Sequence, residues 1–312
     1  MLAGRQNALM QRLAIAAVLL VVPAGCGDGA AATPGTSATT AATARRPAPP
    51  PLCRAARAVQ VGTVDDRQAD ELSGLTVGHA QPDLLWSHND SGDSARIFAL
   101  RRDGTVLGTP AVTGAQAVDW EDIASGPAPG GGELLYAGDI GDNAASRSSI
   151  DVYRFPEPQP DAQTTAPAAR LRLRYPDGAH DAEALLVDPL RHTLVIVTKS
   201  IGLARAYSAS DTLAGGSLTT LRSGPRVPLP LVTAGDVSGD GHLIALRTYF
   251  RLYLWARRGR EPLTAALARP ATCVVAAPLN EGQGEAVALT RTGSAAYTTA
   301  EGTPAIIRRY GT

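Results

Sequence analysis

The chain has 312 residues, with 29 Lys and Arg against 29 Asp and Glu, so its formal net charge is zero. This balance excludes a polybasic nucleic-acid-binding protein, and it excludes a chain dominated by an acidic tail. Aromatic residues make up only 4% of the chain, whereas it holds 32 Gly and 23 Pro. Such a turn-rich composition does not fit a helical bundle or a coiled coil.

The N-terminus has the pattern of an export signal. Arg5 and Arg12 flank a short positive region, residues 13–22 are almost wholly apolar, and small residues follow. The apolar run is too short for a membrane-spanning helix, which needs about 20 residues. We therefore predict a lipoprotein-type signal peptide over residues 1–25.

The end of this segment resembles a bacterial lipobox. Its last residues are Ala-Gly-Cys at 24–26, and the resemblance implies that Cys26 is lipidated after cleavage. Pro23 departs from the lipobox pattern, which prefers Leu or Val there. Cleavage after Ala24 by the ordinary signal peptidase is the alternative, and either route predicts a protein outside the cytoplasm, secreted or held at the cell membrane by a lipid anchor alone.

Residues 26–53 are rich in Ala, Thr and Pro and lack apolar periodicity. A segment of this kind cannot bury enough apolar surface to offset the entropy of ordering, so we predict a disordered tether. The folded domain then covers residues 54–312. In an exported protein Cys53 and Cys273 are a candidate disulfide, and two unpaired buried thiols are the alternative.

The predicted domain consists of short strands. Apolar runs such as residues 193–198 and 252–255 are too short for helices and rich in strand-forming residues. No segment sustains a helical apolar period for three turns, so the expected class is all-β.

Five segments of the domain repeat one pattern of strands. Each opens with an apolar residue that follows a small or acidic one, and these openings are Leu75, Ile123, Leu185, Val237 and Val287, with spacings of 48, 62, 52 and 50 residues. Repeats of about 50 residues with three or four strands indicate a β-propeller of four-stranded blades. We predict five blades, and a sixth within 155–180 or 208–232 stays open.

The last repeat has only three strands before the chain ends. Residues 56–63 form a strand that belongs to no repeat, so we expect it to complete the last blade and close the ring. Fourth strands of other blades are expected at 169–174, 217–221 and 272–276.

In a propeller, the start of each first strand and the end of each second strand meet near the axis of one face. Charged residues occur at nearly all of these points. The candidate catalytic residues are Glu121, Glu183, Glu285, Lys199 and Arg247. The candidate metal ligands are Asp90, Asp139, Asp142, Asn143, Asp236 and Glu301.

Carboxylate and amide oxygens suit Ca²⁺, which takes six to eight oxygen ligands, so Ca²⁺ is the expected cofactor. Lys199, the single lysine of the chain, and Arg247 suit an anionic group of a ligand. The alternative is that the acids cap turns or pair with Arg to stabilise the ring. Trp86 and Trp120 either line the pocket or fill space between blades, and His88 and His180 either transfer protons or simply pack.

Five short motifs resemble those of secreted β-propeller lipoproteins of actinobacteria, which lie near the phytase-like, esterase-like and TolB-like propellers. They lie at residues 71–75, 89–93, 119–123 with 138–143, 180–185 and 283–287. The resemblance covers roughly residues 65–310 and implies acids around the axis that bind Ca²⁺. The sequence does not contain the full calcium-ligand strings of a true phytase.

The first functional hypothesis is an exported, lipid-anchored, calcium-dependent hydrolase of phosphate or carboxylic esters. The alternatives are a non-catalytic propeller that binds a small anionic ligand or a component of the cell envelope, and a structural scaffold. No nucleic-acid partner is expected.

Overall fold

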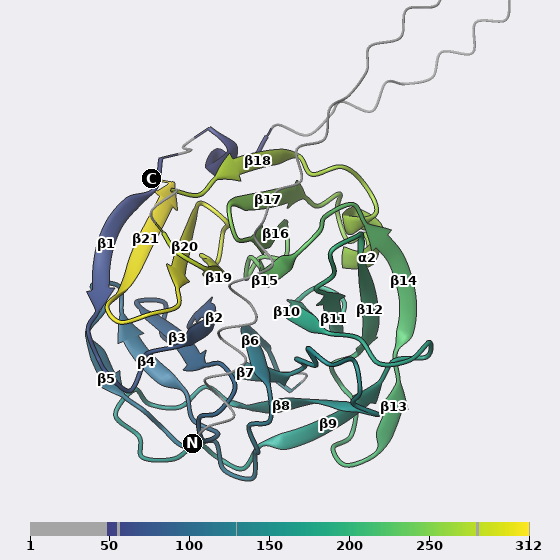
Figure 1. Cartoon of the computed structure of the whole chain (residues 1–312), viewed down its shortest axis with the longest axis horizontal. Helices are drawn as coiled ribbons and strands as arrows, with labels where there is room; N and C mark the ends of the chain where they lie inside the picture. Colours follow the sequence, from purple (N-terminus) through teal and green to yellow (C-terminus); the bar gives the residue numbers. More distant parts are fainter. Residues whose placement is uncertain (1–48, 55–56, 129, 279–280, 312) are drawn as a thin grey trace, which may run out of the picture. The chain divides into compact units, whose positions relative to one another are not determined.

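The computed structural model describes residues 49–54, 57–128, 130–278 and 281–311. Within them the chain forms five small sheets arranged in a ring, which is a five-bladed β-propeller (Figure 1). The predicted all-β class and the blade count are confirmed, and the open sixth blade is absent from these described ranges. The predicted signal peptide, Cys26 and the tether up to residue 48 lie outside them.

The inner three strands of each blade follow one another along the chain. The first blade consists of β2 (Leu72–Val77), β3 (Leu84–Asn89), β4 (Phe98–Arg101) and β5 (Val106–Gly108). The second consists of β6 (Trp120–Pro127), β7 (Glu133–Asp139), β8 (Ile150–Pro156) and β9 (Ala169–Arg174). The third consists of β10 (Ala182–Asp188), β11 (Thr193–Thr198), β12 (Ala204–Ser210) and β14 (Arg222–Val227). The fourth consists of β15 (Val232–Val237), β16 (Leu243–Thr248), β17 (Arg251–Ala256) and β18 (Cys273–Ala276). The fifth consists of β19 (Gly284–Leu289), β20 (Ala295–Ala300), β21 (Ala305–Gly311) and β1 (Val59–Val64).

The two ends of the domain close the ring as predicted. Strand β1 pairs antiparallel with β21, with Val59 opposite Arg309 and Val64 opposite Ala305. Just before it, the short 3₁₀ helix η1 (Pro51–Cys53) is joined to β18 by a disulfide between Cys53 and Cys273. Because the bridge links positions 220 residues apart, it restricts the unfolded chain strongly.

One strand assignment from the sequence is wrong. Residues 217–221 were expected to be the fourth strand of the third blade, but β13 (Leu218–Thr220) pairs in parallel with β9 of the second blade. The fourth strand is β14, which pairs with β12. The buried side chain of Leu221 packs between the second and third blades, so the chain crosses from one blade to the next at this point.

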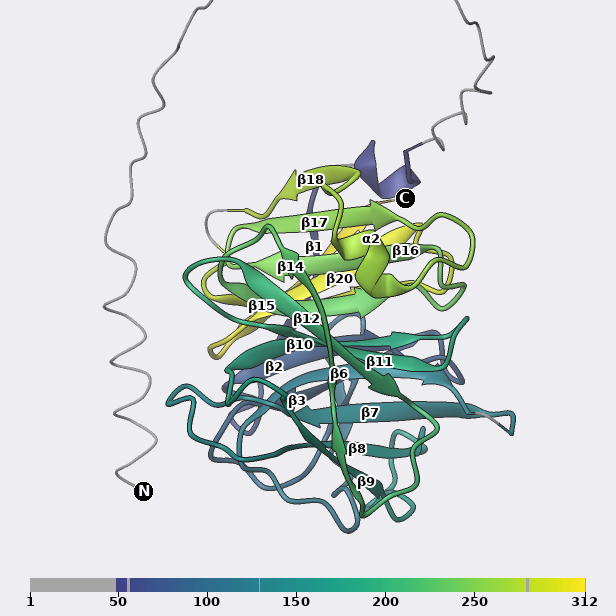
Figure 2. The same cartoon turned by 90° about the vertical axis from the view of Figure 1, so that its right-hand side faces the viewer.

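Four of the five innermost strands are buried along their whole length, and β6 is buried up to its last residue, because neighbouring blades cover both faces. The hydrophobic core lies between the blades; for example, Leu186 and Ile244 join one cluster between the third and fourth blades. One short helix, α2 (Leu263–Leu267), interrupts the all-β pattern between β17 and β18 and lies beside β12 and β14 (Figures 1 and 2). In the described residues, no helix is long and apolar enough to cross a membrane.

Candidate functional site: a carboxylate cluster on the propeller axis

The inner strands share a local irregularity at the end where the site lies. Their pairing registers shift by one residue between Trp120 and Asp122, between Ala182 and Ala184 and between Gly284 and Ala286. Such a β-bulge leaves one residue unpaired and turns its side chain. The unpaired residues are Glu121, Glu183 and Glu285.

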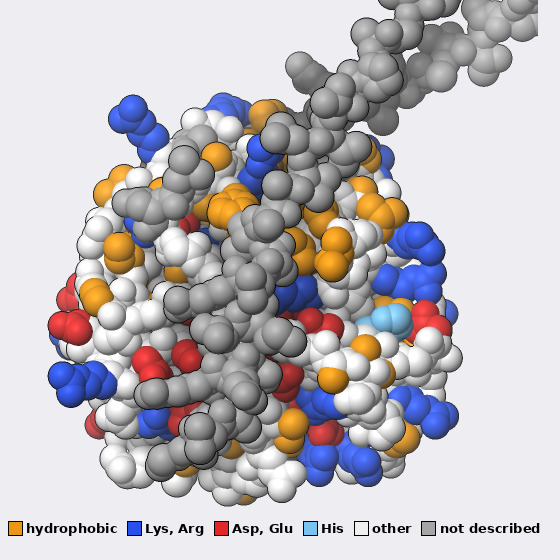
Figure 3. Space-filling view, in the orientation of Figure 1, with side chains coloured by type: hydrophobic (Ala, Val, Ile, Leu, Met, Phe, Trp, Pro, Cys, Tyr) orange, Lys and Arg blue, Asp and Glu red, His pale blue; other side chains and the backbone are white. Residues whose placement is uncertain are grey.

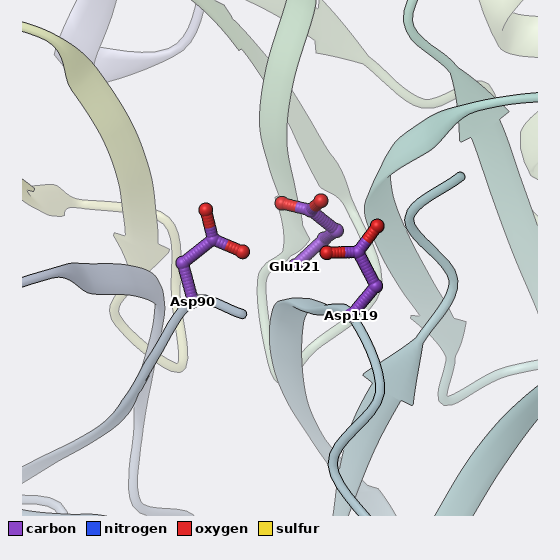
Figure 4. Close-up of side chains that lie close together, drawn as sticks. All are labelled: Asp90, Asp119 and Glu121. Atoms are coloured by element: carbon purple, nitrogen blue, oxygen red, sulfur yellow. The ribbon is translucent and has the colours of Figure 1, made fainter. Parts of the chain in front are cut away.

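Carboxylates from three blades meet beside these glutamates. Asp90, Asp119 and Glu121 each place an oxygen within 4.8 Å of the others, and Figure 4 shows their side chains converging. Glu121, Asp181 and Glu183 form a second group at the same spacing. Glu121 belongs to both groups and connects them. Figure 3 shows Asp and Glu side chains gathered around the middle of this face of the ring.

A glycine makes the closest approach within the cluster possible. A Cβ atom at Gly141 would lie 2.3 Å from Oε1 of Glu121 and 2.6 Å from Oδ2 of Asp119. The backbone N–H of Gly141 also donates to the carbonyl of Asp119 at 3.1 Å, which fixes the loop against the inner strand. Any larger residue at 141 would push the two carboxylates apart.

Glu121 is a buried carboxylate of the cluster with little compensation. Its residue is 3% exposed, and within the described residues no donor forms a hydrogen bond with its carboxylate. Burial, followed by repulsion from Glu183, Asp90 and Asp119, raises the pKa of Glu121 well above its ordinary value. A buried carboxylate without donors is costly unless it is protonated or binds a cation.

Neighbouring carboxyl groups show the same perturbation. Burial, with repulsion from Glu285, Asp119 and Glu71, raises the pKa of Asp90 to about 7. Burial, with repulsion chiefly from Asp181, raises the pKa of Asp119 to about 6. These shifts indicate a surplus of negative charge in a poorly hydrated place.

Lys199 is a cation that faces this cluster. Its Nζ donates to Oε1 of Glu183, and it lies 5.5 Å from the ring centre of Tyr249. Burial lowers the pKa of Lys199, but Glu183 and the acids behind it outweigh burial and raise that pKa above its ordinary value. Lys199 therefore stays charged and neutralises only part of the cluster.

The fifth blade adds a carboxyl pair at the edge of the cluster. Burial, followed by a hydrogen bond with Glu301 and repulsion from it, raises the pKa of Glu285 well above its ordinary value. Nε2 of Gln283 donates to Glu301 at 3.0 Å and holds the second carboxyl in place.

The structure does not bring Arg247 into the cluster as an anion-binding cation. Its side chain is fully buried, Nη2 lies 3.1 Å from Oε2 of Glu281, and Nη1 donates to the carbonyl of Ala286 at 2.9 Å. Gly284 provides the space, because a Cβ there would lie 1.8 Å from Nη2 of Arg247. The sequence could not reveal this role because Glu281 lies on the following blade.

Asp236 also has a structural position. Its two oxygens accept the backbone N–H groups of Val237 at 2.8 Å and Leu289 at 2.6 Å, so it links the fourth and fifth blades. Oδ2 of Asp122 accepts the backbone N–H groups of Leu185 and Gly235, so it links the second blade to the third and fourth. Since both of its oxygens accept amides, Asp236 is a poor metal ligand.

Three further candidate ligands lie at the end of β7 and in the loop that follows it. Asp139 accepts the N–H groups of Val118 and Asp119 and pairs with Arg147 at 2.8 Å. Asp142 accepts the N–H groups of Ser146 and Arg147. Asn143 is exposed. These contacts hold the loop and thereby position Gly141.

The tryptophans and His88 follow the packing alternative. Trp86 and Trp120 are buried, and their indole N–H groups donate to Glu157 and to the carbonyl of Gln116. Burial lowers the pKa of His88 to about 4, and its ring packs edge-on against Trp120. His180, which is more exposed, lies 3.1 Å from Asp177, a partner that the sequence analysis did not identify.

Asp119 and Asp181 were not among the candidate ligands named from the sequence, although Asp181 lies, with Glu183, at one of the converging strand starts. Each precedes a bulge glutamate by two positions, in Asp-Trp-Glu at 119–121 and Asp-Ala-Glu at 181–183. This repeated spacing, just before and within the bulged start of an inner strand, was the available signal.

Comparisons with known proteins extend only to the fold. No protein-family model matches the chain, and no curated protein sequence matches it significantly. Among solved structures, a gluconolactonase from Xanthomonas campestris is 13% identical with a TM-score of 0.45, covering 82% of this chain and 98% of its own. A PQQ-bound aldose sugar dehydrogenase from Streptomyces coelicolor is 12% identical with a TM-score of 0.45, covering 84% and 99%. The WD40 domain of Pan2 from Neurospora crassa is 11% identical with a TM-score of 0.42, covering 82% and 96%.

Proposed function

We propose that the axial carboxylates bind a divalent cation, and that Ca²⁺ is the cation they suit best. The observation that carries this proposal is the pair of three-carboxylate groups that share Glu121, whose own carboxylate has no donor among the described residues. All the ligand atoms that these side chains offer are oxygens, which Ca²⁺ prefers. A Ca²⁺ site also accepts the irregular spacing of ligands from loops and strands. Asp90, Asp119, Glu121, Asp181 and Glu183 would hold the ion.

We further propose that the site hydrolyses an anionic ester, with phosphate esters as the first class to test. A bound calcium ion supplies charge that polarises a phosphoryl or carbonyl oxygen and activates water. Lys199 would orient the anionic part of the substrate from the side of the third blade, while Glu183 keeps the lysine charged and in place. Gly141 would keep the approach to Glu121 open.

A non-catalytic propeller that binds a small ligand or an envelope component is the second candidate. The observation that favours it is that both candidate anion-binding cations already have carboxylate partners. Arg247 pairs with buried Glu281, and Lys199 pairs with Glu183. Export and a lipid anchor on Cys26 belong to either proposal. Mass spectrometry of the mature protein tests the anchor, since an unmodified Cys26 or an N-terminus before residue 26 would contradict it.

Thermal melting separates cation binding from a purely structural acid cluster. A site that exists only in the folded state stabilises that state by mass action, so millimolar Ca²⁺ should raise the melting temperature above the value in EDTA. Glu121→Gln should abolish the calcium effect. Asp83→Asn changes the charge equally at a side chain that is 98% exposed, and it should leave the effect intact.

Hydrolysis of aryl phosphates and aryl esters, measured with and without Ca²⁺, then separates an enzyme from a binding protein. Calcium-dependent turnover that Glu121→Gln and Lys199→Ala both reduce supports the hydrolase. Calcium binding without turnover on either substrate class supports the second candidate, and activity that neither substitution changes would place the reaction elsewhere.

A further inference from the structure

A cavity of about 510 Å³ lies at the end of the third blade opposite to the carboxylate cluster. It is lined by the turn between β10 and β11, by β12 and β14, and by the start of α2. Strand β10 runs from Ala182, beside the cluster, to Asp188 at the cavity, a span of about 20 Å at about 3.3 Å per residue. The cavity volume falls within the range of small-molecule sites.

The pairing of three strands places polar side chains in rows along the cavity. Ser210 lies opposite Thr193, and Ser208 lies opposite both Val195 and Arg222. Directly opposite residues point to the same face of a sheet, so these hydroxyls and Arg222 share one surface. Helix α2 covers part of that surface from the fourth blade, with Leu263 as its apolar contact.

The single carboxylate that lines the cavity is already neutralised. Asp188 receives two hydrogen bonds from Arg257, at 2.8 and 2.7 Å, and both side chains are buried. Oδ1 of Asp188 also accepts the N–H groups of Leu190 and Arg191 at 3.0 and 3.2 Å. These bonds fix the β10–β11 turn that carries Arg191.

Arg191 and Arg222 therefore give the cavity a positive charge. Nη1 of Arg191 donates to the carbonyl of Arg260 at 3.3 Å. The Arg222 side chain makes no hydrogen bond or ion pair within the described part of the chain. Guanidinium groups bind phosphate and carboxylate oxygens through paired hydrogen bonds.

We propose that this cavity is a second binding site, which takes a small phosphorylated and hydroxylated molecule of sugar-phosphate size. Arg222 and Arg191 bind the phosphate, and the hydroxyl groups of Ser208, Ser210 and Thr193 bind the hydroxyls of the ligand. Val195 and Leu263 contact the apolar side of its ring. The site is independent of the carboxylate cluster, because it lies at the other end of β10 and uses no calcium.

Isothermal titration of the full chain in EDTA tests this site with glucose 6-phosphate and inorganic phosphate, and with glucose as the uncharged comparison. We expect glucose 6-phosphate to bind more tightly than the other two. Arg222→Ala should raise its dissociation constant about tenfold or more, since a charged hydrogen bond is lost. Ser208→Leu, which fills the cavity, should weaken binding as well.

The matched control is Arg226→Ala on the same strand, an exposed arginine outside the cavity lining. It should change the dissociation constant by less than about twofold, because distant exposed charges are screened. Equal weakening by Arg226→Ala and Arg222→Ala would reduce the effect to general electrostatics and overturn the proposal. Loss of binding in Lys199→Ala but not in Arg222→Ala would place the phosphate at the axial cluster and overturn the proposal. The absence of binding of both glucose 6-phosphate and inorganic phosphate would overturn it as well.

Discussion

The two ends of β10 carry opposite kinds of charge. At its start, Asp181 and Glu183 join other carboxylates around the axis, and Lys199 is the cation beside them. At its end, Asp188 is enclosed by Arg257, and Arg191 adds a further positive charge. Strand β10 thus runs from the acidic carboxylate cluster to the basic cavity.

The difference lies in the donors around each carboxylate rather than in burial alone. Asp188 is 1% exposed and Glu121 is 3% exposed, so both residues are buried. Asp188 receives donors on both oxygens, whereas Glu121 receives none among the described residues. A buried carboxylate with all its donors is satisfied within the fold, and one without donors is available for a cation.

The largest expected effect comes from Arg257→Leu, which leaves Asp188 buried without its partner. Removal of one partner of a buried ion pair is expected to lower the free energy of unfolding by about 3–5 kcal/mol. Urea denaturation measures this loss. The double substitution with Asp188→Leu should recover much of it, and a single variant as stable as wild type would show that burial alone, not pairing, governs this end of the strand.

Glu121→Gln should change stability in opposite directions with and without calcium. In EDTA the substitution removes repulsion and should stabilise the fold. At a calcium concentration 100 times the dissociation constant, the wild-type protein should gain about 2.7 kcal/mol, which the variant loses. Melting curves in both buffers test the prediction, and parallel curves for the two proteins would contradict it.

The pH profile of the calcium-free protein should reveal the carboxylate cluster. The pKa values of Asp119 and Asp90 are raised to about 6 and about 7 in the folded state, while an unfolded Asp has a pKa of about 3.9. At these two sites the folded state therefore binds more protons, so their contribution to stability should fall as pH rises from about 4 to about 7, and groups with a still higher pKa, such as Asp236 at about 8, should continue the fall at higher pH. Asp90→Asn should flatten the upper part of the fall in melting temperature measured in EDTA, and a rise in stability over this range would refute the charge surplus.

The smallest expected effect on stability comes from Arg222→Ala. The side chain is exposed and makes no bond in the described part of the chain, so the free energy of unfolding should change by less than about 0.5 kcal/mol. Urea denaturation of Arg222→Ala and Arg257→Leu under the same conditions compares the free energies of unfolding of two variants at one cavity. A large decrease in the free energy of unfolding of Arg222→Ala would show that this arginine stabilises the fold rather than binds a ligand.

The repeat pattern was sufficient for the propeller, its five blades and the closure by residues 56–63. Each blade uses local strand and turn signals, so the period survives in the sequence. The assignment of 217–221 failed because a short strand gives no signal about which neighbour it pairs with, and β13 joined the blade before it. The proposed calcium, anionic ligand, envelope partner and lipid anchor stay predictions.

The sequence also placed Glu121, Glu183, Glu285 and Lys199 at the axis, because the ends of inner strands converge in any propeller. It could not separate these residues from Asp236 and Arg247, which occupy similar positions along their strands. Their roles depend on atoms of the following blade, namely the N–H of Leu289 and the carboxylate of Glu281.

By itself, then, the sequence determined the repeating strands, the ring and the surplus of acids at one face, because these follow from local patterns. Only the tertiary structure decided which acids have donors, and only it assembled the cavity beside Arg222 from β12, β14 and the helix of the next blade. The physical reason is that donors and cavity walls come from neighbouring blades. Their distances are set by packing between blades, which no single repeat records.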